Sequence, residues 1–181
     1  MGGKNSGVYG FIDCRRSDRA DRSGAVSRDG DGWKYPQPCG ERERQRAEII
    51  YIRHDSGKTG FTAGCTGHEI HKALAPKDGE RIFDKRFNSA FLDTGLHGHL
   101  QDKGIKNIIL TGLRTEYCID ATCKAAFERD YMVYVPKWAH TTFDNGPFSA
   151  AQLIAFYEER IWNNRFAKVL SHDGLKSILY P

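Results

Sequence analysis

Short apolar runs alternate with longer amphipathic stretches along most of the chain. Most of the runs are rich in β-branched residues, and they lie at residues 49–53, 82–84, 108–111 and 132–135, with a further candidate at 7–13. Runs of this length and composition are typical of buried strands, and the stretches between them are long enough for crossover helices. The alternation predicts an α/β protein with three layers, α/β/α, in which the central layer is a mainly parallel sheet.

Three stretches have the spacing of helices that bury one face. Residues 94–103 and 119–130 lie between predicted strands, so both are interpreted as crossover helices. The last stretch follows Pro147, where Ser149 is a suitable N-cap and where apolar residues from Leu153 to Ile161 recur at helical spacing. We expect this helix to pack against the core.

The segment 14–47 does not follow this pattern. It is dense in Arg, Asp and Glu and contains few apolar residues, a composition that orders poorly on its own. It is therefore interpreted as a solvated or flexible loop. Because the alternating pattern resumes abruptly at Glu48, the segment is either a local divergence or the result of a reading-frame slip upstream of that residue. The whole chain, 1–181, is expected to form one domain.

Composition narrows the class of protein. The chain has 181 residues, a net charge of +4 and five cysteines. The odd cysteine count without paired spacing argues against a disulfide framework, and free thiols suit a reducing compartment. No stretch reaches the roughly 18 apolar residues of a membrane span, and residues 1–7 lack the apolar core of a secretion signal. We expect a cytoplasmic protein without a membrane or nucleic-acid partner.

The most informative motif is the run at residues 108–121, in which an apolar strand leads into a polar turn and Cys118 stands where a helix begins. Unpaired N–H groups and the helix dipole at such a position favour a thiolate over a thiol. A lone cysteine of this kind is more often structural, because free cysteine packs well as a small apolar group. The residues around Cys118 favour the catalytic interpretation.

Three blocks of the sequence resemble the isochorismatase-like cysteine hydrolases, which include nicotinamidases, N-carbamoylsarcosine amidase and streptothricin hydrolase. The blocks lie at residues 50–55, 67–91 and 111–118, and residues 140–144 continue in the same register. The resemblance implies a Rossmann-like fold, no cofactor, and a homo-oligomer, either a dimer or a tetramer. It also implies a catalytic triad of Asp, Lys and Cys, which falls on Asp13, Lys85 and Cys118.

The resemblance further implies an oxyanion site made by the backbone N–H groups of Arg114 and Cys118. It implies a cis peptide bond between Leu113 and Arg114. For the acid, Asp13 ends the first predicted strand, although Asp18, Asp21 and Asp55 are competing candidates. Taken alone, Lys85 would be an ordinary surface lysine.

These residue types suit cleavage of a small amide or carbamoyl C–N bond through a thioester. A carboxylate can accept the thiol proton, and a nearby ammonium stabilises the resulting thiolate. The small-molecule substrate is not specified by the sequence, and Phe87, Tyr117 and Trp138 are the expected pocket residues, although aromatic residues near strand ends are more often core. Two alternatives remain: a non-catalytic scaffold that forms oligomers, and a nucleic-acid binder that uses the arginine-rich segment.

A candidate metal site consists of Cys65, His68 and His71, which are spaced three apart, with His54 and Asp55 upstream. Such a cluster could bind zinc. However, glycines make this stretch a flexible loop, and the Asp-x-His arrangement that nicotinamidases use for their metal is missing. No metal is therefore expected.

Overall fold

The computed structural model describes residues 9–14, 47–55, 57, 62–65, 68–70 and 74–179, and of residues 9–14 it describes the backbone alone. The predicted loop at 14–47 therefore lies, apart from its two end residues, outside the described residues. Within the described part, no helix is long and apolar enough to cross a membrane.

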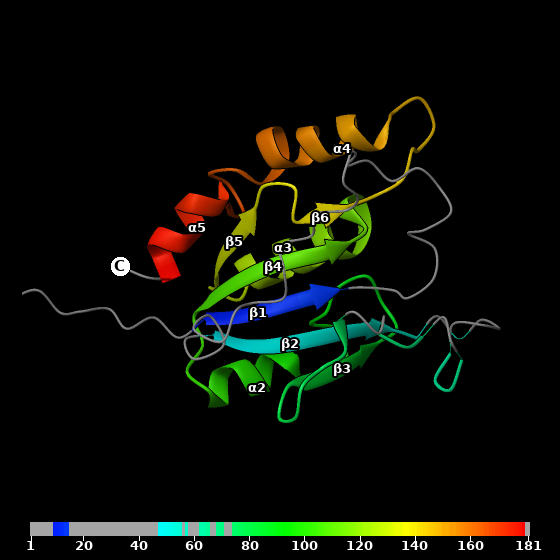
Figure 1. The fold of residues 1–181 in the computed structure, drawn as a ribbon, viewed down its shortest axis with the longest axis vertical. Helices are drawn as coiled ribbons and strands as arrows, with labels where there is room; N and C mark the ends of the chain where they lie inside the picture. Colours follow the sequence, from blue (N-terminus) through cyan, green and yellow to red (C-terminus); the bar gives the residue numbers. More distant parts are fainter. Residues whose placement is uncertain are drawn as a thin grey trace, which may run out of the picture.

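Seven strands of the described residues form one sheet, and all of their pairings are parallel. The strands are β1 (Tyr9–Cys14), β2 (Ala47–His54), β3 (Arg81–Lys85), β4 (Asn107–Leu113), β5 (Met132–Pro136), β6 (His140–Thr141) and β7 (Lys168–Leu170). The order is β3-β2-β1-β4-β5-β7, with β6 beside the end of β4. The arrows of β1, β2 and β4 lie side by side and point the same way (Figure 1).

Helices lie on both faces of this sheet (Figure 1). They are α2 (Leu96–Asp102), η2 (Thr115–Ile119) leading into α3 (Asp120–Phe127), α4 (Ala150–Phe156) leading into η3 (Tyr157–Trp162), and α5 (His172–Leu179). Both η segments are single stretches of π-helix.

The alternation of side chains along β4 divides the core into two layers. Ile108 and Leu110 belong to the larger cluster, which contains the buried apolar residues of α2 and α3. Ile109 points to the opposite face, where it belongs to a smaller cluster with Leu179 of α5. Because successive strand residues face opposite sides, a strand buried on both faces must be apolar throughout, and this explains the continuous Ile-Ile-Leu run.

All five predicted strands and the three predicted helices are present, and the α/β/α fold is confirmed. Ser149 caps α4 through a full capping box: its hydroxyl accepts the Gln152 N–H at 3.2 Å, and the Gln152 side chain accepts the Ser149 N–H at 2.9 Å. Four elements of the described residues were not predicted, namely β6, β7, α5 and η2, which starts the helix predicted at residues 119–130 four residues earlier, at Thr115. The first two are only two and three residues long, too short for a hydrophobic pattern to emerge.

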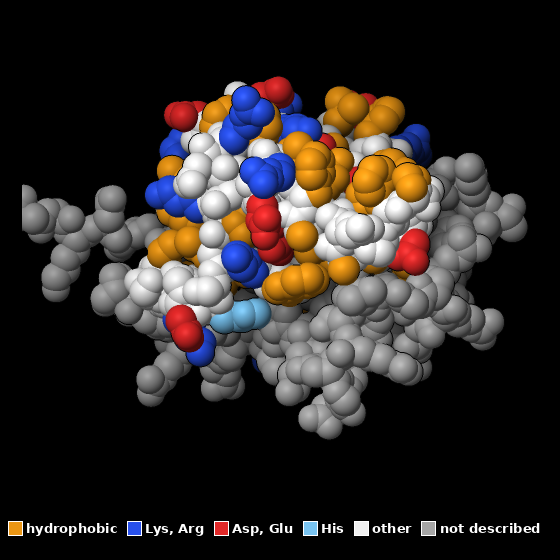
Figure 2. Space-filling view, turned by 90° about the horizontal axis from the view of Figure 1, so that it is seen from above, with side chains coloured by type: hydrophobic (Ala, Val, Ile, Leu, Met, Phe, Trp, Pro, Cys, Tyr) orange, Lys and Arg blue, Asp and Glu red, His pale blue; other side chains and the backbone are white. Residues whose placement is uncertain are grey.

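The face that carries α4 exposes large apolar side chains, which gather among Lys and Arg residues in the space-filling view (Figure 2). Phe148 and Phe156 are both more than half exposed. The two side chains flank the capped start and the end of α4, whereas its buried residues are Ala150 and Ile154.

Candidate active site

The order of the strands changes direction at the central strand β1. The chain runs from β1 to β2 and β3 on one side of the sheet and then crosses to β4 on the other side. In open α/β sheets, such a switch point leaves a crevice at the carboxyl ends of the two strands, and ligands bind there. Asp13 lies at this end of β1, in register with Thr111 of β4. Its side chain lies outside the described residues.

Lys85 ends β3 and is only 2% exposed, whereas a lone lysine in sequence is expected at the surface. Its Nζ donates to the carbonyl oxygens of Phe87 at 2.9 Å and of Asn88 at 2.6 Å. An ammonium has three N–H donors, so these two carbonyls leave one donor for a further acceptor. The turn after Lys85 therefore holds a buried cation at the carboxyl edge of the sheet.

A hydrogen bond connects the turn that follows Lys85 (residues 86–95, the lysine turn) to the helix that follows Cys118. The Ala90 N–H donates to the Thr122 hydroxyl at 3.0 Å, and both residues are fully buried. Thr122 lies one helical turn after Cys118. The segment that contains Lys85 and the helix that contains Cys118 are therefore held against each other.

The turn between β4 and α3 has an unusual backbone. The peptide bond between Leu113 and Arg114 is cis, as the family resemblance predicts. The Arg114 carbonyl then accepts the N–H of Tyr117 at 3.2 Å and that of Ile119 at 3.1 Å. The second of these hydrogen bonds joins residues five apart, as in a π-helix. The Arg114 carbonyl therefore accepts from the residues before and after Cys118.

The two cysteines of this helix have opposite surroundings. Cys118 is partly exposed, while Cys123 is fully buried. Burial, with a smaller effect from the neighbouring Asp120 carboxylate, raises the pKa of the Cys123 thiol to about 12. Cys123 is therefore a structural thiol, and Cys118 is the one that solvent can reach.

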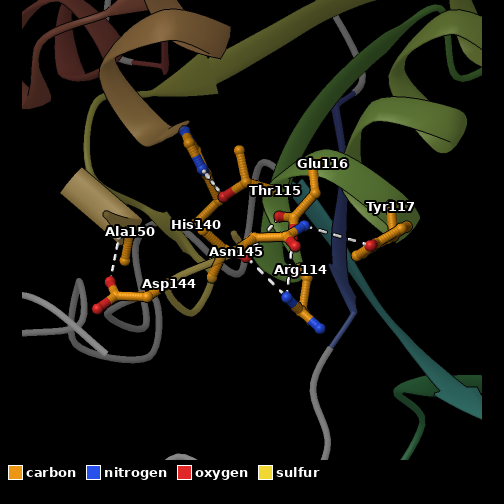
Figure 3. A network of polar contacts seen from close by, with 9 residues as sticks. Arg114, Thr115, Glu116, Tyr117, His140, Asp144, Asn145 and Ala150 are labelled. Atoms are coloured by element: carbon orange, nitrogen blue, oxygen red, sulfur yellow. Dashed lines mark hydrogen bonds and ion pairs between the residues drawn. The ribbon is translucent and has the colours of Figure 1, made fainter. Parts of the chain in front are cut away.

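The outer side of the turn is held by the Arg114 side chain (Figure 3). Its Nη2 donates to Glu116 at 2.9 Å, and Thr142 also donates to the Glu116 carboxylate. The guanidinium carbon lies 5.0 Å from the centre of the Tyr117 ring and 5.1 Å from that of Phe143, distances typical of cation–π contacts. The arginine thus fixes Tyr117 beside Cys118.

The three predicted pocket residues are all exposed to a similar degree. Phe87 is 47%, Tyr117 42% and Trp138 51% exposed. Phe87 lies in the lysine turn, Tyr117 precedes Cys118, and Trp138 lies in the turn between β5 and β6 with a positive φ of 61°. They are not core residues, which was the commoner alternative for aromatic residues near strand ends.

The inner side of the turn contacts three buried polar residues to which the sequence assigned no role. Thr115 of η2, His140 of β6 and Glu158 of η3 are connected by hydrogen bonds. Each residue type is common, and their separation in sequence is up to 43 positions, so no local motif indicates them. His140 belonged to a block that resembles the family, but its partners become visible only in the fold.

His68, in the loop considered for a metal, lies beside an ion pair between Arg53 of β2 and Asp84 of β3. Arg53 forms two hydrogen bonds with the Asp84 carboxylate, and His68 Nε2 lies 3.1 Å from the same carboxylate. His71 lies outside the described residues. In the part of the chain that the structure describes, no group of three His, Cys, Asp or Glu side chains is placed to hold a metal ion.

A cleft of about 620 Å³ lies at the other end of the sheet, where β4 and β5 begin. It is lined by Lys106, Asn107, Phe127 and residues 130–133 and 164–168, with none of the predicted catalytic residues among them. We place the candidate site at the switch point because the polar networks, the buried cation and the accessible thiol all lie at that edge.

Comparison with known proteins assigns the chain to a family. The model of the isochorismatase domain matches residues 41–173. YddQ of Bacillus subtilis, an isochorismatase family protein, is 34% identical over 99 residues, which are 53% of this chain and 55% of YddQ. Streptothricin hydrolase of Streptomyces noursei is 31% identical over 99 residues, 54% of this chain and 39% of that enzyme. The chain thus spans about half or less of these curated relatives.

Solved structures show the same fold. An isochorismatase-family protein from Chromobacterium violaceum aligns with a TM-score of 0.79 at 21% identity, covering 99% of this chain and 96% of the other. At this identity the likeness concerns the fold alone. The fold and the match over residues 41–173 establish that the chain belongs to the isochorismatase family, whose members include hydrolases such as streptothricin hydrolase.

Proposed function

We propose that the protein is a cysteine hydrolase that cleaves a small amide or carbamoyl C–N bond, with Asp13, Lys85 and Cys118 as its catalytic residues. The observation that carries this proposal is the buried Lys85 ammonium, which lies on a turn bonded to the helix of Cys118. Burying an ammonium is costly unless it is paired, so a position with two carbonyl acceptors, and with no third acceptor among the described residues, suits a nearby anion. A Cys118 thiolate or an Asp13 carboxylate would supply that anion.

The first half of the reaction forms a thioester. Asp13 takes the thiol proton of Cys118, and the sulfur attacks the carbonyl carbon of the substrate. The N–H groups of Arg114 and Cys118 donate to the oxyanion of the tetrahedral intermediate. When the C–N bond breaks, Asp13 returns the proton to the nitrogen, so the amine or ammonia leaves neutral.

The second half releases the acid product. A water molecule gives a proton to Asp13 while its oxygen attacks the thioester carbonyl, and the C–S bond breaks. The sulfur leaves as a thiolate that Lys85 stabilises by charge, and the proton then moves from Asp13 to the sulfur, which restores the thiol and the carboxylate. Two relatives act on compounds that fit this scheme by name, streptothricin hydrolase and the ureidoacrylate amidohydrolase RutB of Klebsiella pneumoniae.

The test measures amine or ammonia release from streptothricin, ureidoacrylate, N-carbamoylsarcosine and nicotinamide. We expect Cys118→Ser to abolish turnover of whichever compound is cleaved, and mass spectrometry of the wild type to detect an acyl group on the Cys118 peptide. Lys85→Met should also be inactive, whereas its exposed neighbour Arg86, replaced by Met, serves as the matched control.

Turnover that survives in Cys118→Ser contradicts the proposal. If none of the four compounds is cleaved and Cys118 reacts like an ordinary thiol, the non-catalytic scaffold becomes the better explanation.

A further inference from the structure

A chain of buried polar groups runs beneath the turn that bears Cys118. The Thr115 hydroxyl lies 2.9 Å from His140 Nδ1, and His140 Nε2 lies 3.2 Å from a Glu158 carboxylate oxygen. The same oxygen accepts the Trp138 N–H at 2.8 Å. Thr115, His140 and Glu158 are each no more than 4% exposed. Figure 3 shows His140 reaching toward Thr115 from the neighbouring strand.

We propose that Thr115, His140 and Glu158 are positioning residues that fix the turn of Cys118 for catalysis. The inference rests on the proposed function in one respect, since it takes Cys118 as the nucleophile. The arrangement of hydroxyl, imidazole and carboxylate has the pattern of a nucleophile–base–acid chain. Thr115, however, is fully buried, so its hydroxyl cannot meet a substrate and must act through its neighbours.

The direction of the hydrogen bonds follows from the acceptors. A carboxylate accepts only, so the proton of His140 facing Glu158 is on Nε2. In the neutral ring, Nδ1 is then an acceptor and receives the Thr115 O–H. The carboxylate therefore selects one tautomer of the imidazole, and that tautomer in turn holds one rotamer of Thr115, much as outer partners orient the ligands of a metal site.

Thr115 is the first residue of the helix, three positions before Cys118 and directly after Arg114. The segment from His140 to Thr142 contacts this helix start at two points, because His140 is hydrogen-bonded to Thr115 and Thr142 donates to Glu116. The Trp162 ring packs edge-on against His140 at 4.8 Å and closes the buried side. The position of the turn is thus fixed through two consecutive residues, Thr115 and Glu116.

Stability alone does not explain this chain of groups. A buried His–Glu pair is often no more stabilising than apolar side chains of the same volume, because both groups lose their hydration. A polar chain does, however, specify one geometry through directional bonds, whereas apolar packing tolerates small shifts. Such shifts matter for a nucleophile, since a misplacement of about 1 Å can lower a rate by about 100-fold.

The test compares Thr115→Val with Thr141→Val, using whichever amide the enzyme cleaves. Thr141 is a buried neighbour of His140 whose hydroxyl has no hydrogen-bond partner in the described part of the chain, so it is a matched control. We expect Thr115→Val to lower kcat by about tenfold or more with KM within about twofold, Thr141→Val to retain wild-type values, and Thr115→Ser to restore most of kcat.

A double mutant tests whether the residues act as one unit. Glu158→Gln keeps the side-chain shape and an acceptor for the Trp138 N–H, but it weakens the hydrogen bond to His140 Nε2. We therefore expect this variant to lower kcat, as Thr115→Val does. The double variant should lose no more than the worse single variant, because either change already releases Thr115. Additive losses would contradict a single chain.

The controls separate the two proposals and detect unfolding. Alkylation of Cys123 reports opening of the fold in every variant. If Thr115→Val does not fold, Thr115→Ala is used in its place. If Thr115→Val matches the wild type while Cys118→Ser is inactive, the positioning inference is wrong and the proposed function stands. If Cys118→Ser stays active, the proposed function itself fails.

Discussion

The contrast between Cys118 and Cys123 gives a quantitative prediction for thiol alkylation. With a pKa of about 12, the Cys123 thiol is ionised in roughly one molecule in 10⁴ at about pH 8, whereas an ordinary thiol with a pKa of about 8.5 is about one quarter ionised. The thiolate is the reactive form, so Cys123 is expected to react more than 1,000-fold more slowly than an ordinary thiol, and its burial slows it further. Cys118 is expected to react at least as fast as an ordinary thiol.

The assay treats the native protein with iodoacetamide and follows the Cys118 and Cys123 peptides separately by mass spectrometry. Below its pKa, the ionised fraction of an ordinary thiol falls about tenfold for each unit by which the pH is lowered. A thiolate stabilised by Lys85 should instead keep its reactivity well below pH 8. If Cys118 loses reactivity in parallel with free glutathione, no stabilised thiolate exists. Comparable labelling of Cys123 in the folded protein would refute the argument from burial.

Three further predictions concern stability and can be checked by urea or thermal unfolding. Leu100→Ala removes a fully buried side chain from the larger core cluster and should destabilise the fold by about 2–5 kcal/mol; a loss below about 1 kcal/mol would contradict its place in that core. Ser149→Ala removes the N-cap of α4 and should cost about 1 kcal/mol, while Ser149→Thr should cost less. Burial opposes ionisation of Asp84, but the hydrogen bonds and charge of Arg53 outweigh it and lower the pKa of Asp84. The resulting stability is present above the ordinary Asp pKa of about 3.9 and is lost as pH falls through the lower folded value. Since Asp84 is half exposed, Asp84→Asn should cost less than about 1 kcal/mol at neutral pH, and nothing at a pH below the folded pKa.

The sheet could be predicted from sequence because its strands are buried on both faces. Such strands are continuous apolar runs, as at residues 108–110, and they stand out from polar connections. β6 has only two residues and is recognised by its pairing with Gly112 and Leu113. Its existence depends on tertiary contacts that no local pattern encodes.

The candidate site was predictable only where a motif marks it. Cys118 and Lys85 lie in blocks that resemble the family, and the cis bond at Leu113 was expected on the same ground. The partners of Thr115 come from two distant elements, and their hydrogen bonds arise from packing. The roles of Asp13 and the triad, the cytoplasmic location and the homo-oligomer stay predictions.

The place of β1 has a consequence for any attempt to shorten the protein. β2 and β4 each pair with β1, on opposite edges, and they do not pair with each other. A polypeptide trimmed to residues 41–173, the span that the family model recognises, would lose this shared neighbour and keep two half-sheets whose inner rims bear unpaired amides and carbonyls. Such rims invite intermolecular pairing, so an insoluble product would reflect the loss of β1, together with the loss of most of α5, and would not show that the untrimmed chain is unstable.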